Sequence, residues 1–473
     1  MTTVTTPHAM TIDGAAVPGD DGFDVVNPAT AEVFARAPRC SAADLDAAMS
    51  AADRAAGGWA LDDEARRTAL LAAADTVEAS TDLLAPLLTA EQGKSLADAR
   101  VELHSAAAWL RYFGHLDVSA EPAYDDAGQR FEIGRRPLGV VAAIAPWNFP
   151  VALAVWKLAP ALRAGNTVVL KPSPYTPLTT LALGELLRET VPAGVLNVVS
   201  GPDPLGADMV AHRAPHKISF TGSTATGRRV AASAAATLKR VTLELGGNDA
   251  AIVLDDADPE SIADALFWSA FTNNGQLCFA VKRVYVPEHR YDGFVEALAA
   301  RARMVHVGDG TVDGVQLGPV NNRPQLERVS HLVADALARG GRAAAGGASG
   351  EGPGYFYPPT VLTDVFDGMR IVDEEQFGPA LPVVAYRDVD DAVRRANGTP
   401  YALTASVWSA DTDRAAAVAR RLDGGQVSVN AHGSAVRPDL PFSGHRSSGL
   451  GVENGLWGLH EFTQLQVLAR PTG

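Results

Sequence analysis

Short apolar segments alternate with segments of helical apolar spacing between Gly139 and Gly247, and this alternation constrains the fold more than any other feature. Continuous apolar runs are typical of strands buried on both faces, as in parallel sheets covered by helices. We therefore predict an α/β fold with a doubly wound parallel sheet. The expected strands cover residues 139–146, 166–172, 195–201, 217–222 and 240–247, and the expected helices cover 151–164, 178–190 and 223–238.

The rest of the chain divides into segments of different character. Residues 41–116 carry Ala and Leu at helical spacing, which predicts several amphipathic helices. Residues 130–139, RFEIGRRPLG, have a short alternation of apolar and polar residues flanked by Gly and Pro, which predicts a projecting hairpin rather than core sheet. A second strand-and-helix series is expected from Ala250 to about Arg446, with a loop over the Gly-rich residues 341–354. The loosely alternating residues 461–468 could form an edge strand for a partner subunit.

Length and charge narrow the possible functions. A chain of 473 residues exceeds one ordinary core, so we expect two or three domains. The net charge of −15 repels nucleic acids and anionic membranes, and we expect neither as a partner. Residues 1–10 lack the pattern of a signal peptide, and the two cysteines, Cys40 and Cys278, form no disulfide framework. These features predict a cytoplasmic protein.

Two features indicate a ligand site at the edge where the parallel strands end. Residues 220–227, FTGSTATG, lie between an expected strand and helix, where Gly222 frames the turn and Ser223 can cap the helix. Such a turn is either plain architecture or a pyrophosphate site. Lys171 ends a neighbouring strand, and its ammonium either reaches a ribose or phosphate group or is simply solvated.

Three further residues have unusual surroundings. Cys278 follows the polar residues Asn-Asn-Gly-Gln and is either an inert buried thiol or an activated loop thiol. Glu244 lies in an apolar strand, so it is either paired or functional, because burial raises the pKa of a carboxyl group. Asn148 lies between aromatic and proline neighbours and either holds a turn or donates to an oxyanion. Cys40 has no comparable surroundings and is interpreted as structural.

The segments PWNFP, LKPS, FTGSTATG, LELGG, GQLC and EEQFGP, in this order, resemble the NAD(P)-dependent aldehyde dehydrogenase superfamily over essentially the whole chain. The 34 positions from Glu244 to Cys278 match the spacing in that family. The resemblance implies a homodimer or homotetramer built from a cofactor domain, a second α/β catalytic domain and a small β oligomerisation hairpin. The implied boundaries are 1–116 and 138–247 for the cofactor domain, 248–446 for the catalytic domain, and 117–137 and 447–473 for the oligomerisation segments.

The resemblance also implies roles for individual residues. Cys278 would be the nucleophile, Asn148 and the Cys278 N–H the oxyanion hole, Glu244 the base that activates water, and Lys157 an aid to proton transfer. The expected reaction is oxidation of an aldehyde to a carboxylic acid through a cysteine thioester. His432 would lie near the substrate mouth. The implied cofactor contacts are Trp147, Lys171, Ser173, Gly222, Ser223, Glu375 and Phe377, and no metal is expected.

Three departures from the family pattern bear on specificity. Pro174 stands where many NAD-preferring members carry Glu, so NADP is possible beside Lys171 and Ser173, and we expect both cofactors with NAD slightly favoured. Trp156 stands where succinate-semialdehyde members place Arg, and Phe279 replaces a smaller residue. The expected substrate contacts are Phe149, Trp156, Leu277, Phe279 and Phe442. An apolar tunnel of this kind favours medium-chain or aromatic aldehydes over semialdehyde acids.

Two alternative functions remain open from the residues. A CoA-acylating aldehyde dehydrogenase would release its thioester to a thiol and would not need Glu244. A catalytically inactive dinucleotide-binding protein would retain the fold without the chemistry. A nucleic-acid-binding function is disfavoured by the charge.

Overall fold

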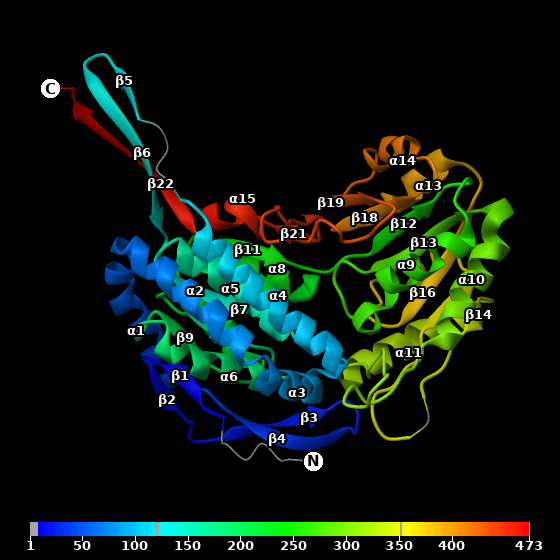
Figure 1. Ribbon diagram of the computed structural model, residues 1–473, viewed down its shortest axis with the longest axis horizontal. Coiled ribbons are helices and arrows are strands. Elements are labelled where there is room, and N and C mark those ends of the chain that lie inside the picture. Colours follow the sequence, from blue (N-terminus) through cyan, green and yellow to red (C-terminus); the bar gives the residue numbers. More distant parts are fainter. Residues whose placement is uncertain (1–7, 119–122, 351, 473) are drawn as a thin grey trace.

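The computed structural model describes residues 8–118, 123–350 and 352–472. Residues 1–7, most of the segment assessed for a signal peptide, lie outside the described residues, as do 119–122 of the expected oligomerisation segment. Two α/β bodies lie side by side, and a long β arm projects from one of them (Figure 1). The predicted domain boundaries stay a prediction, because strand pairing shows which strands share a sheet but not where one domain ends and the next begins.

The first sheet has eight strands, and five of them are the predicted apolar segments. Neighbours among β9, β8, β7, β10 and β11 run parallel, whereas β1, β2 and β21 add antiparallel edges. Every residue of β7 is buried, as a strand covered on both faces requires. The spatial order is β2 (Ala15–Val17), β1 (Met10–Ile12), β9 (Leu196–Val198), β8 (Thr167–Lys171), β7 (Val140–Ile144), β10 (Lys217–Thr221), β11 (Arg240–Glu244) and β21 (Gly449–Leu450).

Helices cover this sheet, and polar caps fix where several of them begin. Ser41 and Asp44 form a capping box at the first helix, and Ser95 accepts from the Asp98 N–H at the fourth. Figure 1 shows α2, α4 and α5 stacked over one side of the sheet. The helices of this half are α1 (Ala42–Leu61), α2 (Asp63–Ala79), α3 (Thr81–Gln92), α4 (Leu96–His115), α5 (Pro150–Arg163), α6 (Leu178–Leu186), α7 (Pro204–Ala211) and α8 (Thr224–Ala235).

The second sheet separates two apolar cores. Along β12, Ala250 and Ile252 belong to one core and Ala251 and Val253 to the other, because successive side chains of a strand point to opposite faces. All neighbouring strands run parallel except β14. The spatial order is β14 (Arg342–Ala345), β15 (Thr360–Thr363), β16 (Ala380–Tyr386), β13 (Val281–Pro287), β12 (Asp249–Val253), β18 (Thr404–Trp408) and β19 (Gln426–Val429).

Helices pack on both faces of this sheet as well, which confirms the second predicted α/β series. Residues of α9 and α10 contribute to one core, and those of α11, α13 and α14 to the other. The helices of this half are α9 (Pro259–Phe271), α10 (Tyr291–Met304), α11 (Arg323–Ala338), α12 (Arg370–Asp373), α13 (Val389–Ala396) and α14 (Thr412–Ala419), with 3-10 turns at Thr272–Gly275 and Glu288–Arg290. The short helix α15 (Gly455–His460) and the 3-10 turn Leu187–Glu189 belong to the first half, where Leu459 and Leu187 join its core.

The projecting arm is a three-stranded antiparallel sheet. It comprises β5 (Tyr124–Asp126), β6 (Gln129–Pro137) and β22 (Thr463–Pro471), with β6 in the middle. The predicted projection of residues 130–139 is therefore confirmed, but the segment forms a single strand, β6, and its hairpin partner is β5 rather than a strand inside 130–139. The chain's own β22 completes the arm. β22 pairs with β6 along its whole length, and Leu465 and Val467 are 61% and 60% exposed.

Two parts of the fold were not predicted correctly. The Gly-rich segment 341–354 is not wholly a loop, because Arg342–Ala345 forms β14 and pairs antiparallel with β15. The short strands near the N-terminus had no strong apolar run and were missed. These strands are β1, β2, β3 (Gly22–Asn27) and β4 (Glu32–Pro38), of which β3 and β4 form a hairpin. The short antiparallel pair of β17 (Tyr401–Ala402) and β20 (His445–Arg446) was also missed.

None of the helices within the described ranges combines the length and apolar character needed to cross a membrane.

Candidate active site

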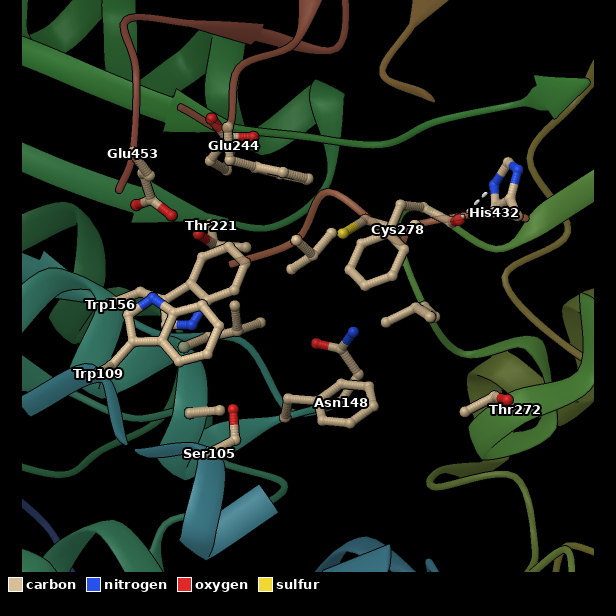
Figure 2. Close-up of a pocket in the computed structure, with 18 of the residues that line it drawn as sticks. Ser105, Trp109, Asn148, Trp156, Thr221, Glu244, Thr272, Cys278, His432 and Glu453 are labelled. Atoms are coloured by element: carbon tan, nitrogen blue, oxygen red, sulfur yellow. Dashed lines mark hydrogen bonds between the residues drawn. The ribbon is translucent and has the colours of Figure 1, made fainter. Parts of the chain in front are cut away.

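Two cavities meet at Cys278. One has a volume of about 410 Å³ and a largely apolar lining, and the other has a volume of about 400 Å³ and lies over the N-terminus of α8. Asn148, Thr221 and Cys278 line both cavities. Figure 2 shows the first cavity, with Cys278, Asn148 and Glu244 contributed by different elements. A group bound in one cavity can therefore react with a group bound in the other at this cysteine.

The polar residues before Cys278 form a left-handed turn. Asn273 and Asn274 have φ angles of 51° and 57°, values that Asn tolerates better than most residues, and Gly275 follows at 66°. The Gln276 side chain accepts from the Asn321 N–H at 2.8 Å and donates to the Asn273 carbonyl at 2.9 Å. The Asn-Asn-Gly-Gln sequence therefore ends α9 abruptly and holds the cysteine loop in place.

Asn148 is fixed against this turn. Its side-chain Nδ2 donates to the Gln276 carbonyl at 3.0 Å, two residues before Cys278. Its own carbonyl accepts from Lys94 Nζ at 3.0 Å and from Asn273 Nδ2 at 3.1 Å. The Asn148 side chain therefore lies beside the cysteine loop, with backbone and side chain both held.

A buried ion pair that the sequence analysis missed supports Asn148. Lys94 pairs with Glu102, and both side chains are fully buried. Glu102 also accepts from the N–H groups of Val151 and Ala152, at the start of α5, at 2.9 and 3.2 Å. Lys94 precedes α4 and Glu102 lies in it, whereas Asn148 comes just before α5. The contact between this ion pair and Asn148 therefore depends on how the two helices pack and cannot be predicted from local sequence.

Glu244 ends β11 with a buried carboxyl group that has no hydrogen-bond partner among the described residues. Burial, and then repulsion by Glu453, raises the pKa of Glu244 well above its ordinary value, while Lys157 acts in the opposite direction. A carboxyl group with a raised pKa in the same cavity as a thiol is suited to general acid–base chemistry. The alternative that Glu244 is a paired structural acid is not what the structure shows.

Lys157 joins two residues that line the first cavity, Glu453 and Thr221. Its Nζ lies 2.7 Å from Glu453 Oε1 and 2.6 Å from Thr221 Oγ1, and the ion pair is almost completely buried. Glu453 was not among the predicted residues. It lies next to the Asn454–Gly455 turn, and nothing in its local sequence indicates burial.

The second cavity collects five of the seven predicted cofactor contacts. Gly222 and Ser223 lie at the strand-to-helix turn, where Ser223 Oγ accepts from the Thr226 N–H at 3.2 Å and caps α8. Trp147 and Phe377 pack edge to face with ring centroids 5.3 Å apart. Glu375 is half-buried and accepts from the Gly247 N–H at 2.9 Å. The N-terminus of α8 borders this cavity and suits a dinucleotide phosphate, and the pyrophosphate role of the turn stays a prediction.

The other two predicted contacts, Lys171 and Ser173, do not line this cavity. Both residues are buried, and Lys171 Nζ donates to the Pro172 carbonyl at 3.2 Å. Burial lowers the pKa of Lys171 to about 8. Lys171 ends β8, two strands away from β10 in the same sheet. Cys40, interpreted as structural, is buried nearby, and burial raises its pKa to about 12.

The second glycine of LELGG is required by a close approach. A Cβ atom on Gly247 would lie 2.7 Å from the Cys278 carbonyl oxygen, which is backbone and leaves no room for a side chain. A Cβ atom on Gly246 would lie 2.3 Å from Glu375 Oε2, the end of a side chain that can move. Gly247 therefore allows the segment after Glu244 and the cysteine loop to converge.

Aromatic rings form one wall of the first cavity. Trp156 stacks on Trp109 at 5.3 Å with an interplanar angle of 12°, and Phe442 packs edge to face on Trp156 at 5.5 Å and on Phe279 at 5.9 Å. Figure 2 shows the Trp109–Trp156 pair across the cavity from Cys278. Within the described part of the chain, no Lys or Arg lines this cavity. All five predicted substrate contacts line it: Phe149, Trp156, Leu277, Phe279 and Phe442.

The sequence and the fold were compared with known proteins. A sequence profile described as "Aldehyde dehydrogenase family" matches residues 16–468. The chain belongs to the aldehyde dehydrogenase family. It is 38% identical to an NADP(+) succinate-semialdehyde dehydrogenase of Escherichia coli, over 95% of this chain and 94% of the relative. It is also 38% identical to a phenylacetaldehyde dehydrogenase of Pseudomonas fluorescens, over 98% and 95% of the two chains.

Solved structures agree with this assignment. An aldehyde dehydrogenase of Bacillus cereus superposes with a TM-score of 0.96 at 34% identity, covering 99% of this chain and 97% of the other. The predicted family and α/β fold class are therefore confirmed. The activity of this dehydrogenase is the NAD(P)-dependent oxidation of an aldehyde.

Proposed function

We propose that this enzyme oxidises an apolar aldehyde, aliphatic or aromatic, to a carboxylic acid through a thioester on Cys278. The observation that carries the proposal is the position of Cys278 at the junction of the two cavities. The apolar cavity would hold the aldehyde, and the cavity over α8 would hold the cofactor. We assign the nucleophile to Cys278, the oxyanion contact to Asn148 and the base to Glu244.

In the first step, the Cys278 sulfur forms a bond to the aldehyde carbon, and the carbonyl oxygen takes the negative charge. Burial raises the pKa of the thiol, and its proton passes to water as the sulfur attacks. Asn148 Nδ2 and the Cys278 N–H would donate to the oxyanion. NAD or NADP, when bound, supplies the acceptor for the hydride that leaves the carbon.

In the second step, the thioester is hydrolysed. Glu244 would take a proton from water, the water oxygen would attack the acyl carbon, and the carbon–sulfur bond would break to release the thiolate. The raised pKa of Glu244 makes the carboxylate a stronger base than an exposed glutamate. Lys157 pairs with Glu453, the carboxylate that repels Glu244, so we assign it a supporting role in proton transfer.

The substrate class follows from the cavity lining. A semialdehyde acid would bring its carboxylate into a cavity without a cationic side chain among the described residues, which is costly. A benzaldehyde or hexanal chain would instead contact Phe149, Leu277 and the Trp109–Trp156 pair. We therefore infer preference for uncharged aldehydes, as in the phenylacetaldehyde dehydrogenase relative.

The experiment is a panel of benzaldehyde, phenylacetaldehyde, hexanal and succinate semialdehyde, assayed by cofactor reduction with the wild type and Cys278→Ala. The expected kcat/KM is at least about tenfold higher for the uncharged aldehydes than for succinate semialdehyde, which corresponds to about 1.4 kcal/mol. A preference for succinate semialdehyde would overturn the substrate class. Turnover retained by Cys278→Ala would overturn the thioester route, and an acyl product formed only with CoA would favour the acylating alternative.

We further propose that the enzyme uses both NAD and NADP, with NAD slightly preferred. Pro174 brings no carboxylate to repel a ribose phosphate, and Lys171 ends the strand beside it. Separate kinetics with each cofactor test this. An NADP efficiency thousands of times below that of NAD would contradict it.

We also propose a homodimer or homotetramer in the cytoplasm. Along β22, the exposed apolar side chains of Leu465 and Val467 lie on the projecting arm, where a second copy could cover them. A free thiol nucleophile also suits a reducing compartment. Light scattering should give a mass two or four times that of one chain; a monomeric mass would refute the assembly.

A further inference from the structure

Lys282 lies four residues after Cys278, in β13, and its side chain is fully buried. Its Nζ donates to the Leu277 carbonyl at 2.5 Å and to the Ala280 carbonyl at 3.2 Å. The same ammonium lies 5.8 Å from the centroid of the Phe377 ring, within the range of a cation–π contact. One cation therefore connects the loop of the nucleophile to a residue of the cofactor cavity.

A second side chain holds the carbonyl between these two. His432 Nε2 donates to the Phe279 carbonyl at 2.7 Å, as Figure 2 shows, and its Nδ1 accepts from Ser406 Oγ at 2.9 Å. Burial lowers the pKa of His432 to about 4, so the ring is neutral near pH 7 and has one N–H to donate. The carbonyls of residues 277, 279 and 280 are thus all held, which fixes the backbone around Cys278.

Burial is the main cause that raises the pKa of Cys278, and three acids add to it. Glu244, Asp249 and Glu375 each raise the pKa of Cys278, whereas Lys282 lowers it. Asp249 accepts from Thr404 Oγ1 at 2.6 Å, and burial raises its pKa to about 7, with Lys282 acting in the opposite direction. Without a cation, a thiolate at this position would face these three acids in a desolvated site.

We propose that Lys282 is a positioning residue for the nucleophile: its ammonium fixes the carbonyls before and after Cys278 and offsets the carboxylates that face the sulfur. This inference rests on the proposed function of Cys278. Lys282 itself acts through the loop and its charge rather than by contact with the aldehyde. Burial lowers the pKa of Lys282, whereas Glu375, Asp249 and Cys278 act through space in the opposite direction. Both of its hydrogen bonds go to neutral carbonyls, so no carboxylate is paired with it directly.

The test measures the thiolate directly. The rate at which iodoacetamide alkylates Cys278 is followed against pH, in the full-length enzyme without cofactor, by mass spectrometry of the Cys278 peptide. Lys282→Met removes the charge and both hydrogen bonds, Lys282→Gln keeps a donor without the charge, and Lys282→Arg keeps the charge. In Lys282→Met and Lys282→Gln, the midpoint of the profile of alkylation rate against pH should rise by about one pH unit or more. Alkylation at a pH below the midpoint then becomes about tenfold slower. Lys282→Arg should show the wild-type profile.

Lys239→Met is the matched control. Lys239 Nζ also donates to two carbonyls, those of Val210 and His212, at 2.5 and 2.6 Å, but at the opposite end of β11 from Glu244. The Lys239→Met variant should have lower thermal stability but the same alkylation profile against pH as the wild type. Wild-type profiles in Lys282→Met and Lys282→Gln would overturn the proposal, as would an equal shift in Lys239→Met. If the Met variant does not fold, the profile of the Gln variant decides.

The turnover of Cys278→Ala separates this inference from the proposed function. If Cys278→Ala retains turnover, Cys278 is not the nucleophile and the proposed function fails. If Cys278→Ala loses turnover but both neutral Lys282 variants are alkylated as the wild type is, only the role of Lys282 fails. Steady-state kinetics add a second readout: kcat should fall about tenfold or more in Lys282→Met, while the KM for cofactor stays near the wild-type value.

Discussion

Replacement of Glu244 by Gln should change stability in a way that depends on pH. Both carboxyl oxygens of Glu244 are buried without partners among the described residues, and its pKa is raised from 4.5 mainly by burial. Gln has nearly the same shape and is never charged. The variant therefore removes a buried acid while leaving the surrounding packing in place.

The sign follows from proton binding. Between pH 4.5 and the pKa of the folded protein, Glu244 keeps its proton in the folded state and loses it in the unfolded state. Raising the pH through this range therefore favours unfolding of the wild type by about 1.4 kcal/mol per pH unit. The Gln variant does not lose stability in this way. The pH-dependent difference in unfolding free energy, Gln variant minus wild type, should be near zero below pH 4.5. It should grow at this slope up to the folded-state pKa of Glu244 and stay constant above it.

The assay is urea unfolding followed by tryptophan fluorescence, for both proteins, from pH 4 to 9. Glu91 and Asp249 also have pKa values raised to about 7, but they titrate in both proteins and cancel in the difference. A difference in unfolding free energy that does not change with pH would refute the reasoning, because Glu244 would then titrate alike in both states. A Glu244→Asp variant, which retains the charge, should keep the wild-type slope.

Three further predictions follow from contacts in and beside the site. Lys157→Met should destabilise the protein by about 3–5 kcal/mol because it leaves Glu453 buried without its partner, and adding Glu453→Gln should recover much of the loss in urea unfolding. Trp156→Arg should raise the kcat/KM ratio of succinate semialdehyde to benzaldehyde by about tenfold or more, whereas Trp156→Leu should not; an unchanged ratio would show that charge does not decide this specificity. Ser223→Ala should lower stability by about 1 kcal/mol and weaken NAD and NADP alike in calorimetric titration, and a loss confined to one cofactor would contradict a phosphate-turn role.

Much of the fold could be predicted because its signals are local. The strand Val140–Ile144 is a continuous apolar run, and several helix starts carry polar caps. Short strands with weak patterns were missed. Arg342–Ala345 pairs with β15 although its Gly-rich surroundings are typical of a loop, and β1 joins its sheet through β9, which is far away in the sequence.

The candidate site could be predicted only where a residue's own neighbours were unusual. Cys278, Glu244 and Asn148 each stand in a local setting that is odd for a plain core residue, and the family resemblance gave them roles. Glu453 and Lys94 act through partners 296 and 8 positions away, Lys157 and Glu102, and no local pattern indicates either ion pair. Trp109 joins the aromatic wall from α4 through a stacking contact that only the tertiary packing creates.

The most direct test of the thioester route is mass spectrometry of Glu244→Gln after mixing with NAD and benzaldehyde. The variant should form the acyl-enzyme but hydrolyse it slowly, because its neutral amide cannot take a proton from water. We predict one burst of cofactor reduction per active site and the mass of a benzoyl group on the Cys278 peptide. A burst without acylation of Cys278, or undiminished steady-state turnover by this variant, would contradict the account.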